Sequence, residues 1–145
     1  MRMFLIALTS ALTGCGSIGL DTMDTGGMNS ILGVDPAGQI DFGQHSASAA
    51  KAARKDVVLW VDGGQPLAIV DVYLDTASDS SFWMSNDLPL PIRLSPDMEF
   101  PIEVRYNPGD DGTHRGELVI LLDDGTLEGA YVRRPIVGEG CNGDC

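Results

Sequence analysis

Residues 98–106, MEFPIEVRY, alternate apolar and polar side chains with a period of two. The apolar side chains that share one face are Phe100, Ile102, Val104 and Tyr106. Because successive side chains of a strand point to opposite faces of a sheet, this pattern predicts a strand that is buried on one side only. Such a strand needs a second layer to cover its apolar face, which favours a fold of two packed sheets.

Short runs of the same kind recur along residues 31–140 and are separated by turns rich in Gly, Pro and Asp. They are ILGVDP, QIDFG, RKDVVLWVD, LAIVDVYLD, SSFWMS, RGELVILLD and EGAYVRRPIVGEG. No segment has a sustained helical period, so we predict an all-β antiparallel sandwich of about seven strands. Pro101 and Pro135 cannot donate ladder hydrogen bonds, so their strands are expected to have an open edge or a bulge there.

The first fifteen residues combine a cation, Arg2, with an apolar run that is too short to span a bilayer and long enough for a signal peptide. The run ends in Leu12-Thr13-Gly14-Cys15, which resembles the lipobox of bacterial lipoproteins. The resemblance implies a signal peptide over residues 1–14, cleavage before Cys15 and a diacylglycerol on its sulfur. The alternatives are an ordinary signal peptide with a chance cysteine, or a buried N-terminal strand.

Residues 15–30 are then the lipidated cysteine and a flexible, Gly-rich linker, and the lipid on Cys15 makes the membrane a partner. Gly16, rather than Asp, follows the cysteine, which favours the outer membrane. We therefore expect a lipid-anchored protein of the bacterial cell envelope, on the periplasmic or the surface face.

The tail at residues 141–145 contains the two remaining cysteines, Cys141 and Cys145. An exported protein meets oxidants, so a disulfide between them is favoured, with modest stabilisation because the loop is short. Free thiols and metal-bound thiolates are the alternatives. Zinc usually takes four ligands, and His45 and His114 have no motif spacing, so no metal or cofactor is expected.

The formal net charge is −12 and the sequence pI is about 4.2. An acidic surface repels phosphates, so nucleic acid is not an expected partner.

No catalytic residue is expected, since neither histidine lies in a recognisable nucleophile or base motif. His114 falls in the turn DDGTHR and is interpreted as part of a solvated hairpin tip. The alternative is a small envelope hydrolase that uses Asp and His from loops. Trp60 lies in an apolar run and is expected in the core, whereas Trp83 is the better candidate for exposure. Trp83, Pro101 and Pro135 are the expected partner surface.

Several short motifs occur in the order and spacing of a known domain family. They are Asp41-Phe42-Gly43, Pro66-Leu67-Ala68-Ile69, Val104-Arg105-Tyr106-Asn107-Pro108, Gly116-Glu117-Leu118-Val119-Ile120 and Gly138-Glu139-Gly140. Residues 31–140 thus resemble the bacterial Ig-like domain called choice-of-anchor D, which is related to hydin-type domains. The resemblance implies a seven-stranded Ig-like β-sandwich without an enzymatic mechanism. It also implies an envelope module that binds an unidentified envelope or surface protein or has a structural role.

Overall fold

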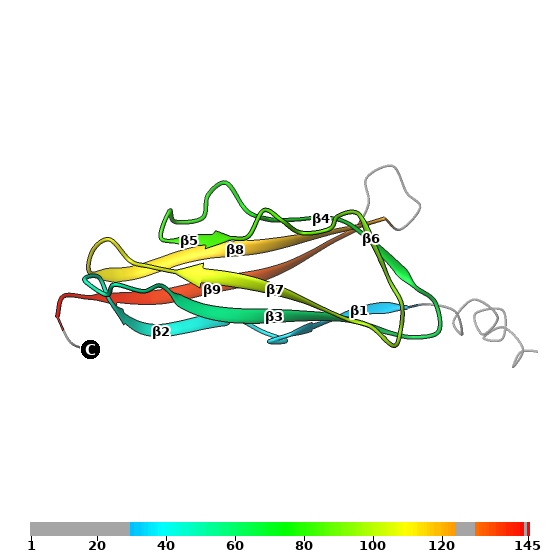
Figure 1. Ribbon diagram of the computed structural model, residues 1–145, viewed down its shortest axis with the longest axis horizontal. Helices are drawn as coiled ribbons and strands as arrows, with labels where there is room; N and C mark the ends of the chain where they lie inside the picture. Colours follow the sequence, from blue (N-terminus) through cyan, green and yellow to red (C-terminus); the bar gives the residue numbers. More distant parts are fainter. Residues whose placement is uncertain (1–29, 124–129, 144) are drawn as a thin grey trace, which may run out of the picture.

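The computed structural model describes residues 30–123, 130–143 and 145. The nine strands found there are β1 (Ile31–Asp35), β2 (Ile40–Ser46), β3 (Ala53–Asp62), β4 (Leu67–Leu74), β5 (Phe82–Met84), β6 (Ile92–Leu94), β7 (Glu99–Tyr106), β8 (Gly112–Asp123) and β9 (Ala130–Cys141). They form two sheets, sheet A in the order β1-β3-β7-β5 and sheet B in the order β2-β9-β8-β4-β6. Figure 1 shows the two sheets as an elongated sandwich, with β1 and β2 along one side and β4 and β5 along the other.

The predicted all-β sandwich is confirmed, but two details of the prediction are wrong. The described residues contain nine strands rather than about seven, because ILGVDP and QIDFG form two separate strands, β1 and β2, and because Ile92–Leu94 adds the short β6. The pairing is also not wholly antiparallel, since β2 runs parallel to β9. The parallel pair arises because β1 pairs with β3 in sheet A and the chain then crosses to sheet B, where β2 lies beside β9.

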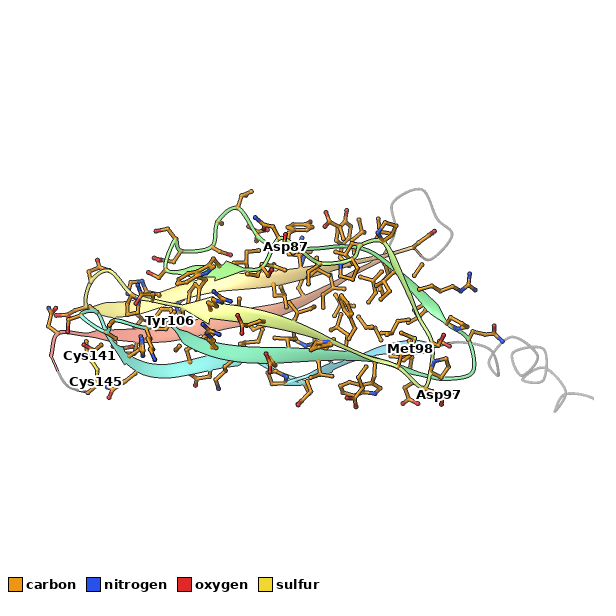
Figure 2. The ribbon with its side chains drawn as sticks, viewed as in Figure 1. Asp87, Asp97, Met98, Tyr106, Cys141 and Cys145 are labelled. Carbon is orange, nitrogen blue, oxygen red and sulfur yellow. A yellow bond between two sulfur atoms is a disulfide. The ribbon has the colours of Figure 1, made fainter. Side chains whose placement is uncertain are left out.

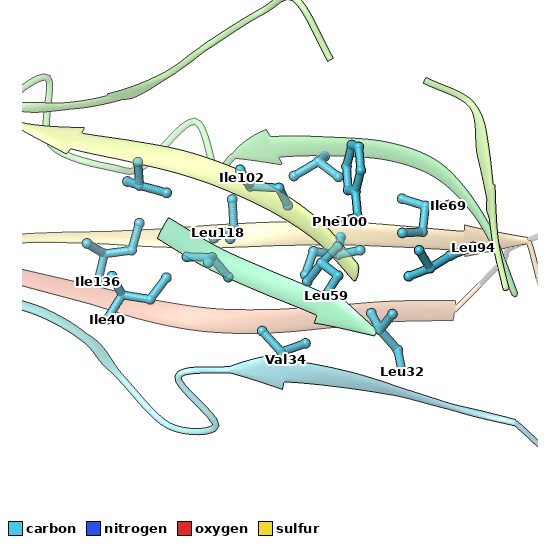
Figure 3. Packing of buried hydrophobic residues seen from close by; sticks show 14 of the residues in the cluster. Leu32, Val34, Ile40, Leu59, Ile69, Leu94, Phe100, Ile102, Leu118 and Ile136 are labelled. Carbon is cyan, nitrogen blue, oxygen red and sulfur yellow. The ribbon is translucent and has the colours of Figure 1, made fainter. Parts of the chain in front are cut away.

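The inward faces of the strands form one continuous apolar layer between the sheets (Figure 3). The four apolar residues of β7 identified from the alternation are all buried, with at most 8% of the surface of each exposed. Leu59 of β3, Leu118 of β8 and Ile136 of β9 approach them from the neighbouring strands and are also buried. Full burial of one such aliphatic side chain contributes about 1.5–3 kcal/mol, so this layer is the main source of stability.

Trp60 does not belong to this layer, and the prediction that it lies in the core is wrong. Leu59 and Val61 occupy the inward positions of β3, so the residue between them points outward. Its half-buried indole lies over Gly33 of the neighbouring β1.

At the opposite end of the sandwich, a cluster of aromatic rings surrounds Tyr106, which is fully buried. Its ring centroid lies 4.9 Å from that of Phe82 and 5.4 Å from that of Phe42. Gly138 of β9 lies against the same ring, and a Cβ added at this glycine would be 2.5 Å from Cζ of Tyr106. The close approach of sheets A and B at this end therefore requires a residue without a side chain.

Replacing Gly138 by Ala is expected to lower the free energy of unfolding by about 1–3 kcal/mol, because the buried Tyr106 ring has no free space into which to move. Urea denaturation followed by tryptophan fluorescence measures the change. Gly64→Ala is the matched control, since a Cβ there meets nothing within 4 Å. Equal stability of the two variants would contradict the packing at Tyr106.

Candidate functional site

The strands leave a groove along one side of the sandwich, between β4 of sheet B and the chain that follows β5 of sheet A. Two adjoining hollows of about 310 and 440 Å³ make up this edge groove, and Val72, Tyr73 and Asn86 line both. The other lining residues are Asp71 and Leu74 from β4, Phe82, Trp83 and Met84 from β5, and Ser85, Leu88 and Leu90 from the following segment.

The groove is open because the strands beside β4 are short. β6 pairs only with Leu67–Ile69, so the remainder of β4 has no partner strand on that side among the described residues. β5 has three residues, and the segment after it contains Pro89 and Pro91, which cannot donate ladder hydrogen bonds. Figure 2 shows Asp87 of this segment beside β4.

β4 has an irregularity next to a local side-chain hydrogen bond. The register of β4 against β8 shifts between Ile69 and Asp71, which places an irregularity at Val70. Next to it the backbone N–H of Val72 donates a hydrogen bond of 2.8 Å to Oδ1 of Asp71. This carboxylate therefore occupies a backbone donor of β4 beside the irregularity.

Trp83 is the most exposed of the three aromatic side chains that line this groove, with 38% of its surface exposed. It lies on β5 opposite Arg105 of β7. Pro101 lies at the same edge of sheet A. β3 pairs with one edge of β7, and β5 pairs with the other edge only at Val104–Tyr106, so the part of β7 that contains Pro101 is open there.

Pro135 is not part of this surface. It lies on β9 just before Ile136, where the pairing with β2 begins, and so on the other side of the sandwich. Among the three residues expected to form a partner surface, the structure therefore brings Trp83 and Pro101 to one side and leaves Pro135 on the opposite one.

Two of the three cysteines lie within the residues that the structure describes. Cys15, the expected lipidation site, lies outside the described residues. Cys141 and Cys145 are joined by a disulfide with their Cα atoms 6.4 Å apart, at the same end as Tyr106 (Figure 2). The described residues include no helix long and apolar enough to cross a membrane.

His114 is buried, so the interpretation of it as part of a solvated hairpin tip is wrong. Only 6% of its surface is exposed, and Nδ1 lies 3.2 Å both from Oγ of Ser81 and from Oδ1 of Asp79. Nε2 is turned toward Asp110, whose backbone oxygen is 3.3 Å away. His114 is the third residue of the long strand β8 and points inward, where its ring contacts that of Tyr106.

A serine, a histidine and an aspartate thus meet, but not in the order that activates a nucleophile. In a catalytic triad the serine and the aspartate use opposite nitrogens of the imidazole. Here Ser81 and Asp79 both approach Nδ1, and Ser81 itself is buried. Neither His114 nor His45, whose Nε2 lies 2.9 Å from the carbonyl oxygen of Lys51, lines the edge groove. The arrangement fixes the loop before β5 onto β8.

The electrostatics of this cluster follow from its hydrogen bonds. The backbone N–H of Ser81 donates to Oδ1 of Asp79 at 2.8 Å, and this bond, with a second from the Ser81 hydroxyl and the proximity of His114, lowers the pKa of Asp79. Burial, reinforced by the negative charges of Asp79, Glu139 and Asp110, raises the pKa of Tyr106 to about 12. Its hydroxyl has no hydrogen-bond partner within the described residues. Tyr106 is therefore a neutral packing group at physiological pH.

No group of three or more His, Cys, Asp and Glu side chains that could hold a metal ion occurs in residues 30–123, 130–143 and 145.

The architecture is shared with solved structures at low sequence identity. A protein of unknown function from Porphyromonas gingivalis matches 78% of this chain and 48% of its own, with 13% identity and a TM-score of 0.56. The VesB protease of Vibrio cholerae matches 85% of this chain and 35% of its own, with 10% identity and a TM-score of 0.55. The Escherichia coli chaperone DraB matches 81% and 58%, with 12% identity and a TM-score of 0.50.

This chain spans less than two thirds of each of these solved chains. No family model matches the sequence. No curated protein matches it either. At such identities the likeness shows the fold alone, and together with the two-sheet topology it defines the chain as an Ig-like β-sandwich domain.

Replacing Asp79 by Asn is expected to destabilise the fold at pH 7 and to matter less in acid. A carboxyl group whose pKa is lowered on folding stabilises the native state above its ordinary pKa, here 3.8, and loses that contribution as the pH falls through the lowered value. The difference in the free energy of unfolding between the parent and Asp79→Asn should therefore shrink as the pH falls below about 4. Urea titrations at pH 7 and pH 3 measure it.

Asp87→Asn provides the control for that experiment, because the carboxylate of this exposed aspartate has no hydrogen bond or ion pair within the described residues. A pH-independent effect of Asp79→Asn would show that its charge does not contribute to stability.

Proposed function

We propose that this chain is a non-enzymatic, lipid-anchored module of the bacterial cell envelope that binds a protein partner through its edge groove. The choice-of-anchor D resemblance of residues 31–140 and the Ig-like fold support the module, and the lipobox-like residues before Cys15 support the anchor. The solved neighbour DraB is itself named a chaperone, which is in keeping with a binding role on this fold.

The observation that carries the proposal is the edge groove beside Trp83. It combines a large, partly exposed aromatic side chain with a hollow that is lined by both polar and apolar groups. Binding energy at protein interfaces is concentrated in a few residues, among which tryptophan is enriched. Such a surface is expected to bury an apolar side chain of the partner.

The shape of the groove favours an extended segment. The part of β4 from Val70 to Leu74 has no partner strand on this side among the described residues, so a segment of the partner can lie along it and direct alternate side chains inward. Since Asp71 already accepts the N–H of Val72, that position contributes less to backbone pairing than the apolar contacts do.

Trp83→Ala is expected to reduce recovery of the partner by roughly tenfold or more, because truncation of a central aromatic residue typically costs 2 kcal/mol or more of binding free energy. A photo-crosslinking residue in place of Asn86, which lines both hollows, captures the partner from envelope membranes for identification by mass spectrometry. Tyr131→Ala is the control, because this aromatic residue is more exposed but lies on β9. Loss with Tyr131→Ala and none with Trp83→Ala would refute the assignment of the groove.

Anchoring is tested by the intact mass of the protein isolated from native membranes. We expect a chain that begins at Cys15, with the added mass of a diacylglycerol and an amide-linked acyl chain, and without the two hydrogens lost in the Cys141–Cys145 disulfide. Several acyl chains give stable anchoring, whereas one is marginal. Cys15→Ser should leave the leader uncut and the chain unmodified. An unmodified mass for the natural sequence would exclude the lipid anchor.

A further inference from the structure

A separate hollow lies on the outer face of sheet A, at the end of the sandwich that Asp97 and Met98 mark in Figure 2. It has a volume of about 360 Å³ and is lined by Asp35 of β1, Val58 and Trp60 of β3, and Glu99 of β7. None of these four residues lines the edge groove. We infer that this tryptophan pocket binds the guanidinium group of an arginine side chain from a partner protein.

The indole of Trp60 is held in place by its neighbour on β1. Gly33 lies directly opposite in the register, and a Cβ added at this glycine would be 2.1 Å from Cε2 and 2.5 Å from Nε1 of the indole. Only glycine therefore allows the ring to lie against the backbone of β1. The ring is fixed on that side, and its remaining surface, together with Val58, forms the apolar part of the pocket.

Two carboxylates flank this ring from the neighbouring strands. Glu99 is the register partner of Trp60 on β7, and Asp35 lies one outward-facing position away on β1. Since adjacent strands are about 4.8 Å apart, the two strands that carry the carboxylates are separated by roughly 10 Å, and β3, which carries Trp60, lies between them.

The carboxylates of Asp35 and Glu99 have no hydrogen bond or ion pair with any residue that the structure describes. Farther along the same face the negative charge is compensated, because Glu103 forms ion pairs with both Arg54 and Arg105. The negative charge at the tryptophan pocket is therefore uncompensated locally, in a chain whose net charge is already −12. Such a field attracts cations.

A guanidinium group matches this arrangement in three ways. A cation is attracted to the face of an indole, the best of the aromatic rings for this interaction. The planar fork carries five N–H donors, which allows it to serve carboxylates on two sides at once. Guanidinium is also weakly hydrated and stacks on aromatic surfaces more readily than an ammonium group does.

The chain contains two tryptophans, so its indole N–H groups give two signals in a ¹H–¹⁵N correlation spectrum. Trp60→Phe and Trp83→Phe assign them. Titration of the ¹⁵N-labelled full chain with N-acetyl-arginine methylamide is expected to shift the Trp60 signal along a saturable curve and to leave the Trp83 signal in place. The uncharged analogue N-acetyl-citrulline methylamide, of nearly equal shape, should not shift either signal.

Glu99→Gln should weaken the apparent affinity for the arginine probe by about threefold to fivefold, as expected for loss of one partly solvated ion pair. Asp87→Asn removes the same charge at a distance from the pocket and should not change it. A linear response, an equal response to the citrulline analogue or equal effects of the two variants would overturn the inference. None of these outcomes bears on partner capture at the edge groove, which the Asn86 crosslink and Trp83→Ala report separately.

Discussion

Every part of this structure depends on burying alternate side chains between two sheets. β7 is the clearest case, since four of its eight residues point inward and are covered by sheet B. Because the period of a strand is two, the same geometry forces the intervening residues outward. The core therefore also determines the chemistry of the surface: once Leu59 and Val61 point inward, Trp60 must lie on the outer face of sheet A. The proposed binding surfaces are thus consequences of the packing and not additions to it.

Two large aromatic residues depend on glycines of a neighbouring strand or the facing sheet. Gly138 gives the ring of Tyr106 its space in the interior, and Gly33 gives that of Trp60 its place on the outer face. The consequences differ. Inside, the close fit produces a buried phenol with a raised pKa beside His114. Outside, it produces an indole held beside Asp35 and Glu99, whose charges no described residue compensates. The first arrangement lies in the interior, and the second lies on the surface, where we propose that it binds an arginine side chain.

The edges of the sheets distinguish the two sides of the sandwich. On one side β2 pairs with β9 along most of its length, and the switch of the first strand between sheets closes the gap between them. On the other side β5 and β6 are three residues each and leave parts of β7 and β4 uncovered. A short edge strand protects against uncontrolled aggregation but leaves apolar side chains beside it accessible. This explains why Trp83 is exposed in a groove, whereas Phe42, Phe82, Phe100 and Tyr106 are buried.

The sequence by itself determined the all-β class and the inward residues of β7, because periodicity and turn residues are local properties. For Trp83 it indicated only the better candidate for exposure. It did not reveal the parallel β2–β9 pair, the contact of His114 with Asp79 and Ser81, or the tryptophan pocket. The Asp79–Ser81 turn had a local signal in its Asp-x-Ser spacing, but His114 lies 33 residues from Ser81 and had none. Which strands become neighbours is decided by long-range packing, and only that choice brings β1, β3 and β7 side by side so that an indole, a glycine and two carboxylates meet.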